Sequence, residues 1–99
     1  MNEELRRDIE AFVEQNTEAV FRDIARLVAI DSVEGAPEED APFGPGPRRA
    51  LELGLQIARE LGLGAVNCEG RIGYASVGGE GERYLATITH LDVDRKSVV

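Results

Sequence analysis

A proline- and glycine-rich block near the middle of the chain sets the strongest limit on how these 99 residues can fold. The block reads DSVEGAPEEDAPFGPGP, residues 31–47, and it holds all four prolines and three glycines. Proline lacks a backbone N–H, and glycine weakens regular structure, so neither a helix nor a central strand can run through this density. The sequence therefore predicts a loop here, and ordered loops of this length often have a function.

Two amphipathic helices are expected before this loop. The first covers residues 3–15 and places apolar side chains at helical spacing, namely Leu5, Ile9, Phe12 and Val13. Asn16 or Thr17 is expected to cap the second helix, because either side chain can accept a hydrogen bond from an unpaired backbone N–H. Its apolar stripe consists of Val20, Ile24, Leu27 and Val28. We therefore predict that the two helices pack as a hairpin.

A third helix is expected to begin where the loop ends. Pro45 or Pro47 can occupy its first turn, where a missing N–H breaks no helical bond. Its apolar side chains are Ala50, Leu51, Leu55, Ile57, Ala58 and Leu61. Gly62 suits the C-terminal cap of this helix, because that position commonly has a positive φ.

Three short segments after the third helix read as strands: AVNC (65–68), RIGYASV (71–77) and YLATITH (84–90). The last has the strongest strand character, and GGEGE (78–82) before it has the composition of a turn. We therefore predict an antiparallel hairpin of 71–77 with 84–90. The fold class expected from this order is α/β, with helices packed on a mixed β-sheet.

The composition excludes some functions. Nineteen acidic residues against eleven basic residues give a net charge of −8, and nucleic-acid binding needs clustered positive charge. Cys68 is the single cysteine, so no disulfide can form within the chain, and we expect it to pack as a small apolar residue. The N-terminus lacks the apolar centre of a signal peptide, and no apolar run is long enough to span a bilayer. We expect a cytoplasmic protein with no membrane or nucleic-acid partner.

His90 and Asp92 form the one candidate site. At positions i and i+2 they point to the same side of an extended segment, and they lie at the carboxyl end of a predicted strand, where sites in α/β proteins gather. An imidazole can bind zinc or manganese, and a carboxylate can fix its tautomer. An ordinary hydrogen-bonded pair is the alternative, because a catalytic zinc needs about three protein ligands. The chain has one histidine and one cysteine.

Four blocks in order resemble one enzyme family. They are IARLVAIDSVEGAP (24–37), APFGPGPRRALELGLQIARELG (41–62), VNCEGRIGYASVG (66–78) and ITHLDV (88–93). The last resembles the H-x-D-V motif of the M20 metallopeptidases. Together the blocks are similar to the dipeptidase branch, the PepV-like and Sapep-like enzymes. The resemblance covers nearly the whole chain up to Val93.

This resemblance implies that residues 1–93 are the N-terminal part of a truncated, zinc-dependent exopeptidase-like catalytic domain. It implies that His90 is a metal ligand and that Asp92 is a catalytic residue supporting the site. The parent active site would hold two divalent metal ions, zinc or manganese, and would cleave short peptides. The parent could be a homodimer. The general base and the remaining ligands would lie beyond this chain, so we expect the 99 residues alone to be inactive.

Two alternatives remain open at this point. An N-acyl-amino-acid deacylase of the same family would share the H-x-D-V motif. A small acidic interaction module without catalysis would also fit the composition, and His90 would then tolerate replacement.

The last six residues, DRKSVV (94–99), depart from the family, which usually continues with V-P after H-x-D-V. The nucleotide string GATCGGAAGAGCGTCGTGTAG encodes these six residues and a stop codon, and it matches a widely used sequencing adapter. We therefore interpret residues 94–99 as a non-native tail, and Asp94 is not counted as a ligand.

Overall fold

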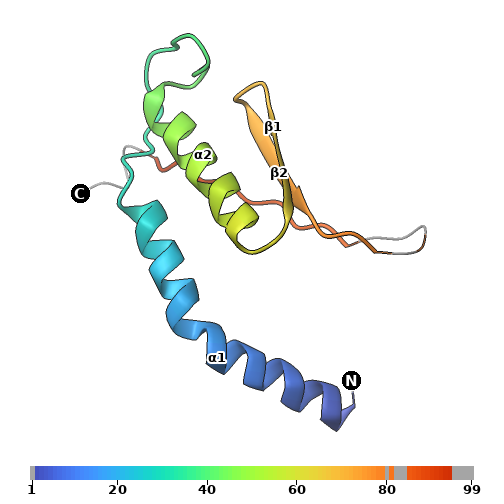
Figure 1. Ribbon diagram of the computed structural model, residues 1–99. Coiled ribbons are helices and arrows are strands. Elements are labelled where there is room, and N and C mark those ends of the chain that lie inside the picture. The colour runs from blue at the N-terminus through green and yellow to red at the C-terminus, as the bar shows by residue number, and fades with distance from the viewer. Residues whose placement is uncertain (1, 80, 82–84, 95–99) are drawn as a thin grey trace.

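The computed structural model describes residues 2–79, 81 and 85–94, with two helices and two strands in that part of the chain (Figure 1). Helix α1 covers Glu3–Val28 and helix α2 covers Pro45–Glu60. Strands β1 (Gly64–Cys68) and β2 (Ile72–Ser76) pair antiparallel. Helix α2 packs on this sheet, and α1 contacts α2. The α/β class is therefore confirmed.

The predicted hairpin of two helices before the loop is wrong, because α1 is one continuous helix of 26 residues. The side chains expected to cap a second helix act as donors instead. Asn16 Nδ2 donates to the carbonyl of Phe12, and Thr17 Oγ1 donates to the carbonyl of Val13. Bonds to the carbonyl four residues earlier are compatible with an uninterrupted helix. The N-cap is Asn2, whose Oδ1 accepts from the N–H of Leu5 at 2.7 Å.

Both ends of α2 follow the sequence prediction. Pro45 and Pro47 lie in its first turn, after Gly44, whose φ is 97°. At the other end Gly62 has a φ of 87°, its N–H donates to the carbonyl of Arg59, and the N–H of Leu63 donates to the carbonyl of Ala58. This pair of bonds is the Schellman motif that a C-terminal glycine favours.

The hairpin lies earlier in the chain than predicted. Strand β1 pairs with β2 through the turn at Glu69 and Gly70, which have φ values of 60° and 71°. The predicted strands at 65–68 and 71–77 are confirmed in β1 and β2, but the pairing of 71–77 with 84–90 is wrong. Tyr84 and parts of the predicted turn lie outside the described residues.

Residues 85–90 form no strand. Leu85 and Ile88 are 93% and 97% exposed. A strand needs a neighbour for its backbone groups, and within the described chain the named strands pair only with each other. Further along, Val93 forms an isolated parallel bridge with Val33, and its N–H donates to the carbonyl of Ser32 at 3.4 Å.

The core lies between α2, the hairpin and the base of the loop. Its buried apolar members are Ala41, Ala50, Leu55, Ile57 and Ala58. Gly73 of β2 makes the close approach of α2 possible, because a Cβ there would lie 2.8 Å from Leu51 Cδ1 and 2.9 Å from Leu55 Cδ2. Neither helix of the described chain combines the length and the apolar character that a membrane crossing requires.

Backbone hydrogen bonds between its own residues hold the long loop between the helices together. The N–H of Gly35 donates to the carbonyl of Phe43 at 2.8 Å, and Glu38 and Ala41 exchange backbone bonds. Gly46 in the first turn of α2 lies directly against the carbonyl oxygen of Asp31. Phe43 is 38% exposed, and its ring lies 5.9 Å from the Arg71 guanidinium, a cation–π contact that ties the loop to the hairpin.

Candidate functional site

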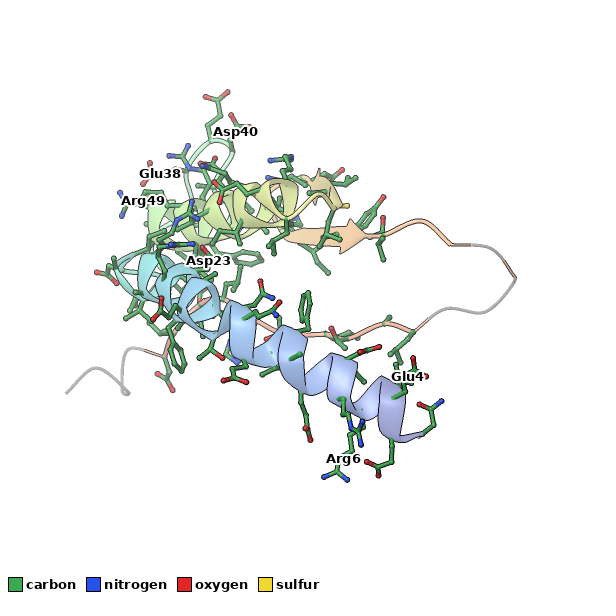
Figure 2. All side chains as sticks on the ribbon, turned by 60° about the horizontal axis from the view of Figure 1, so that its bottom comes forward. Glu4, Arg6, Asp23, Glu38, Asp40 and Arg49 are labelled. Atoms are coloured by element: carbon green, nitrogen blue, oxygen red, sulfur yellow. The ribbon has the colours of Figure 1, made fainter. Side chains whose placement is uncertain are left out.

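A groove of about 840 Å³ lies between the C-terminal half of α1, one face of α2, strand β2 and residues 89–92. Its walls are largely apolar, with contributions from Ile24, Leu27, Leu51, Leu55, Leu61 and Ile72. Polar groups at the groove include Asp23, Glu34, Tyr74, His90 and Asp92. Asp23 lies in the part of α1 that runs alongside α2 (Figure 2). The predicted site residues therefore face a cavity of the size that small-molecule sites have.

An ion pair holds the two helices that form this groove. Arg26 Nη1 and Nη2 of α1 lie 2.7 Å and 3.1 Å from the two carboxylate oxygens of Glu60 in α2. Arg26 also donates to Asp23 at 3.1 Å. The hydrogen bonds from Arg26 and from Gln56 lower the pKa of the Glu60 carboxyl, while the bonds to Glu60 and Asp23 raise the pKa of the guanidinium. This charge arrangement joins α1 to α2 through side chains that remain open to solvent.

His90 and Asp92 lie close together, as their spacing predicts. The Nδ1 atom of His90 is 3.0 Å from the backbone carbonyl oxygen of Asp92 and 3.4 Å from its Oδ1. Both neighbours are acceptors, so this geometry favours the tautomer with a proton on Nδ1. The Nε2 atom then carries the lone pair that a metal ion binds, and a carbonyl behind Nδ1 is a usual way of orienting a metal-binding histidine.

The position of this pair is fixed by its neighbours on both sides. Leu91 packs against α2 so closely that a Cβ on Gly54 would lie 2.9 Å from its Cδ1. The bridge between Val93 and Val33 holds Val93 beside the loop. The side chains of His90 and Asp92 remain 84% and 57% exposed, so both can be reached from solvent.

The donors present do not make a complete metal centre. Across the described residues, no group of three or more His, Cys, Asp or Glu side chains is arranged to hold a metal ion. The thiol of Cys68 lies half-buried in β1 and is not disulfide-bonded. A catalytic zinc requires about three protein ligands, so His90 and Asp92 alone do not meet that requirement.

The sequence did not single out Glu34 and Tyr74, which also line the groove. Glu34 could have been suspected from its place in the long loop. The position of Tyr74 at the groove could not be predicted from the sequence, because it follows from the pairing of β2 with β1. Tyr74 pairs with Val66, and this pairing of strands was not expected.

Comparisons with known proteins point in one direction. No family model matches the chain. Two proteins of Staphylococcus aureus, from strains USA300 and NCTC 8325, each named "Putative dipeptidase", are 35% identical to it over 83 residues. The match covers 82% of this chain and 18% of each relative, so the chain spans about a fifth of the length of the curated relatives it matches. The chain is thus similar to the corresponding fifth of proteins that bear a dipeptidase name.

Proposed function

We propose that this chain forms the N-terminal part of the catalytic domain of a metal-dependent dipeptidase of the M20 family, in its PepV-like and Sapep-like branch. The observation that carries the proposal is the 35% identity over 83 residues to proteins named for dipeptidase activity. The H-x-D-V motif at His90 to Val93 adds support. The backbone carbonyl of Asp92 orients the imidazole through Nδ1, which leaves Nε2 of this exposed ring for a metal ion.

In this proposal the substrate is a short peptide, and the reaction is hydrolysis of its peptide bond. A divalent metal, zinc or manganese, would polarise the scissile carbonyl and activate water when bound. His90 would offer Nε2 to that metal, and Asp92 would hold the imidazole in the required tautomer. The remaining ligands of that metal would come from outside the described residues, which hold no complete centre.

The groove adds a second line of support. It combines apolar walls with a few polar groups, His90 and Asp92 among them, which is the usual composition of a site for a small organic substrate. The acidic balance of the chain favours a substrate with a positive group, such as the free amino end of a peptide.

A chimera tests the proposal. Residues 1–93 would replace the matching segment of the S. aureus protein from strain USA300, and cleavage of dipeptides would be measured with zinc or manganese. Metal-dependent turnover should appear, and His90→Ala and Asp92→Asn should each lower it at least 100-fold, the order expected when a catalytic group is lost. Glu39→Gln, at the exposed loop tip, is the matched control and should leave turnover unchanged.

A chimera that folds and shows no metal-dependent turnover would count against the proposal. Activity that survives His90→Ala would also count against it. Activity on N-acyl amino acids and not on dipeptides would favour the deacylase alternative.

A further inference from the structure

Arg71 is the single Arg or Lys side chain among the described residues that line the groove. The carboxylates on the same wall belong to Asp23, Glu34 and Asp92. Arg71 is exposed, so its guanidinium can be reached by a molecule that enters from solvent. It therefore gives an otherwise acidic and apolar groove one place where a negatively charged group can bind.

The guanidinium of Arg71 has no ion-pair partner among the carboxylates in the described part of the chain. It lies instead over the ring of Phe43, 5.9 Å from the ring centre. This contact uses the face of the guanidinium, and its five N–H donors, which lie in the plane, stay available. Arg26 is the contrast, because its guanidinium is already bonded to Glu60 and Asp23.

The hairpin turn and the long loop together fix the place of Arg71. Its backbone N–H donates to the carbonyl of Cys68 at 3.1 Å, which closes the turn. A Cβ on Gly70 would lie 3.1 Å from the carbonyl oxygen of Asp40, so the turn packs against the loop. The turn and the loop lie at the N-terminal end of α2 (Figure 1). The same loop supplies Phe43, so the guanidinium is supported by both segments.

We propose that Arg71 is a specificity-determining residue that binds the C-terminal carboxylate of the peptide substrate. The inference rests on the proposed function, since it names the part of that substrate which the groove selects. At neutral pH a dipeptide carries an ammonium group at one end and a carboxylate at the other. The groove carboxylates suit the ammonium group. The planar fork of N–H donors on Arg71 suits the carboxylate, because it can hold both oxygens at once.

The first test is binding of peptides to the 99-residue chain, followed by NMR of the arginine Nε–H groups and the backbone amides. The probes are alanyl-leucine, its C-terminal amide, and an alanyl-glutamate whose α-carboxyl is amidated, so that only the side-chain carboxylate remains. Alanyl-leucine should shift the Nε–H signal of Arg71. Both amidated peptides should bind roughly 10-fold more weakly, because they cannot form the charge-assisted hydrogen bonds of a terminal carboxylate.

Three variants assign this preference to Arg71. Arg71→Gln should abolish it, and Arg71→Lys should keep part of it, because lysine retains the charge without the fork of donors. Arg49→Gln is the matched control and should keep the full preference. Arg49 is exposed on α2, where Figure 2 labels it, and it does not line the groove.

The second test uses the chimera described under the proposed function. Arg71→Gln should raise the KM for alanyl-leucine roughly 10-fold and change kcat by less than about twofold, because a remote carboxylate is bound alike in the ground state and the transition state. The KM for alanyl-leucine amide should stay the same in the two proteins. Arg49→Gln should change neither constant.

Equal binding of alanyl-leucine and its amide to the 99-residue chain, or no binding of either, would overturn the proposal. A preference that survives Arg71→Gln would also overturn it, and so would a preference for the side-chain carboxylate of the alanyl-glutamate derivative. A chimera without turnover would count against the proposed function alone. The binding measurement on the 99-residue chain would still decide the role of Arg71.

Discussion

Arg26 and Glu60 join the two helices through a bidentate ion pair, with nitrogen–oxygen distances of 2.7 Å and 3.1 Å across 34 residues of sequence. Glu60→Gln should lower the thermal midpoint by a few degrees at most, because pairs that remain open to solvent contribute little and are screened by salt. Thermal melting followed by circular dichroism at low and high salt measures this. Glu52→Gln on the same helix, whose contact with Arg48 is 3.9 Å, is the matched control and should change nothing.

The same pair predicts a pH dependence. The pKa of Glu60 in the folded chain is lowered below its ordinary value of 4.5, so its contribution to stability is fully present above that ordinary value. The contribution should fall away as the pH drops through the lowered pKa. In Glu60→Gln this part of the acid sensitivity should be absent, and an identical acid profile in the two proteins would contradict the assignment.

Among the glycines at the base of the loop, Gly46 is the one whose replacement by alanine should lower the stability of the fold most. A Cβ at this position would meet the carbonyl oxygen of Asp31, a backbone atom that cannot move aside as a flexible side chain would. Gly46→Ala should therefore destabilise the fold by roughly 1–3 kcal/mol or more. Urea denaturation gives the value. Gly78→Ala, where an added Cβ has nothing within 4 Å, should stay within about 0.5 kcal/mol and serves as the control.

The continuity of α1 can be tested at Asn16 and Thr17. Both side chains bond to carbonyls four residues earlier, so Asn16→Ala and Thr17→Ala should be neutral or slightly stabilising, since alanine is the better helix former. A loss of about 1 kcal/mol at either position would indicate an N-cap and hence two helices. Asn2→Ala, which removes the observed cap, is the comparison and should reduce helicity at the N-terminus.

Zinc should bind the 99-residue chain weakly and without a defined stoichiometry. One imidazole with one nearby carboxylate is too few donors for a stable tetrahedral centre, and the described residues offer no larger group. Isothermal calorimetry with the unsubstituted chain and with His90→Ala checks this. A tight one-to-one site that disappears in His90→Ala would show that these residues suffice.

Peptide hydrolysis by the 99-residue chain alone should be undetectable. Under the proposed function the general base and further metal ligands come from outside these residues, and loss of a general base by itself costs about two to four orders of magnitude in rate. A dipeptide-cleavage assay in zinc or manganese is the measurement. Turnover that His90→Ala abolishes would contradict the expectation.

The sequence predicted correctly those features of the fold that depend on the geometry of neighbouring residues. Pro45, Pro47 and Gly62 mark the ends of α2 correctly, because proline and glycine act through their own backbone geometry. The closeness of His90 and Asp92 follows in the same way from alternation along an extended segment. These features need no information about distant residues.

Other features of the fold could not be predicted, because the same residue fits more than one local structure. Asn16, for example, can cap the start of a helix or donate to a carbonyl inside one, and the residue type alone does not distinguish the two. Glu69 occupies a positive φ that seldom suits a side chain, so the true hairpin turn was hidden beside the more glycine-rich GGEGE. The segment 85–90 has the composition of a buried strand, but composition cannot supply the neighbour that would pair with it. Glu34 and Tyr74 reach the groove through tertiary packing alone.

The bridge between Val33 and Val93 has a consequence for the order of folding. The other elements form from neighbours: α1 and α2 are local, and the hairpin needs only a short turn. The bridge must instead close a loop that contains α2 and the whole sheet, and the entropy of closure rises with loop length. It should thus form last and open first. The segment carrying His90 and Asp92 would then exchange its amide hydrogens sooner than α2 does, and once the bridge opens only the packing of Leu91 on α2 would still hold it.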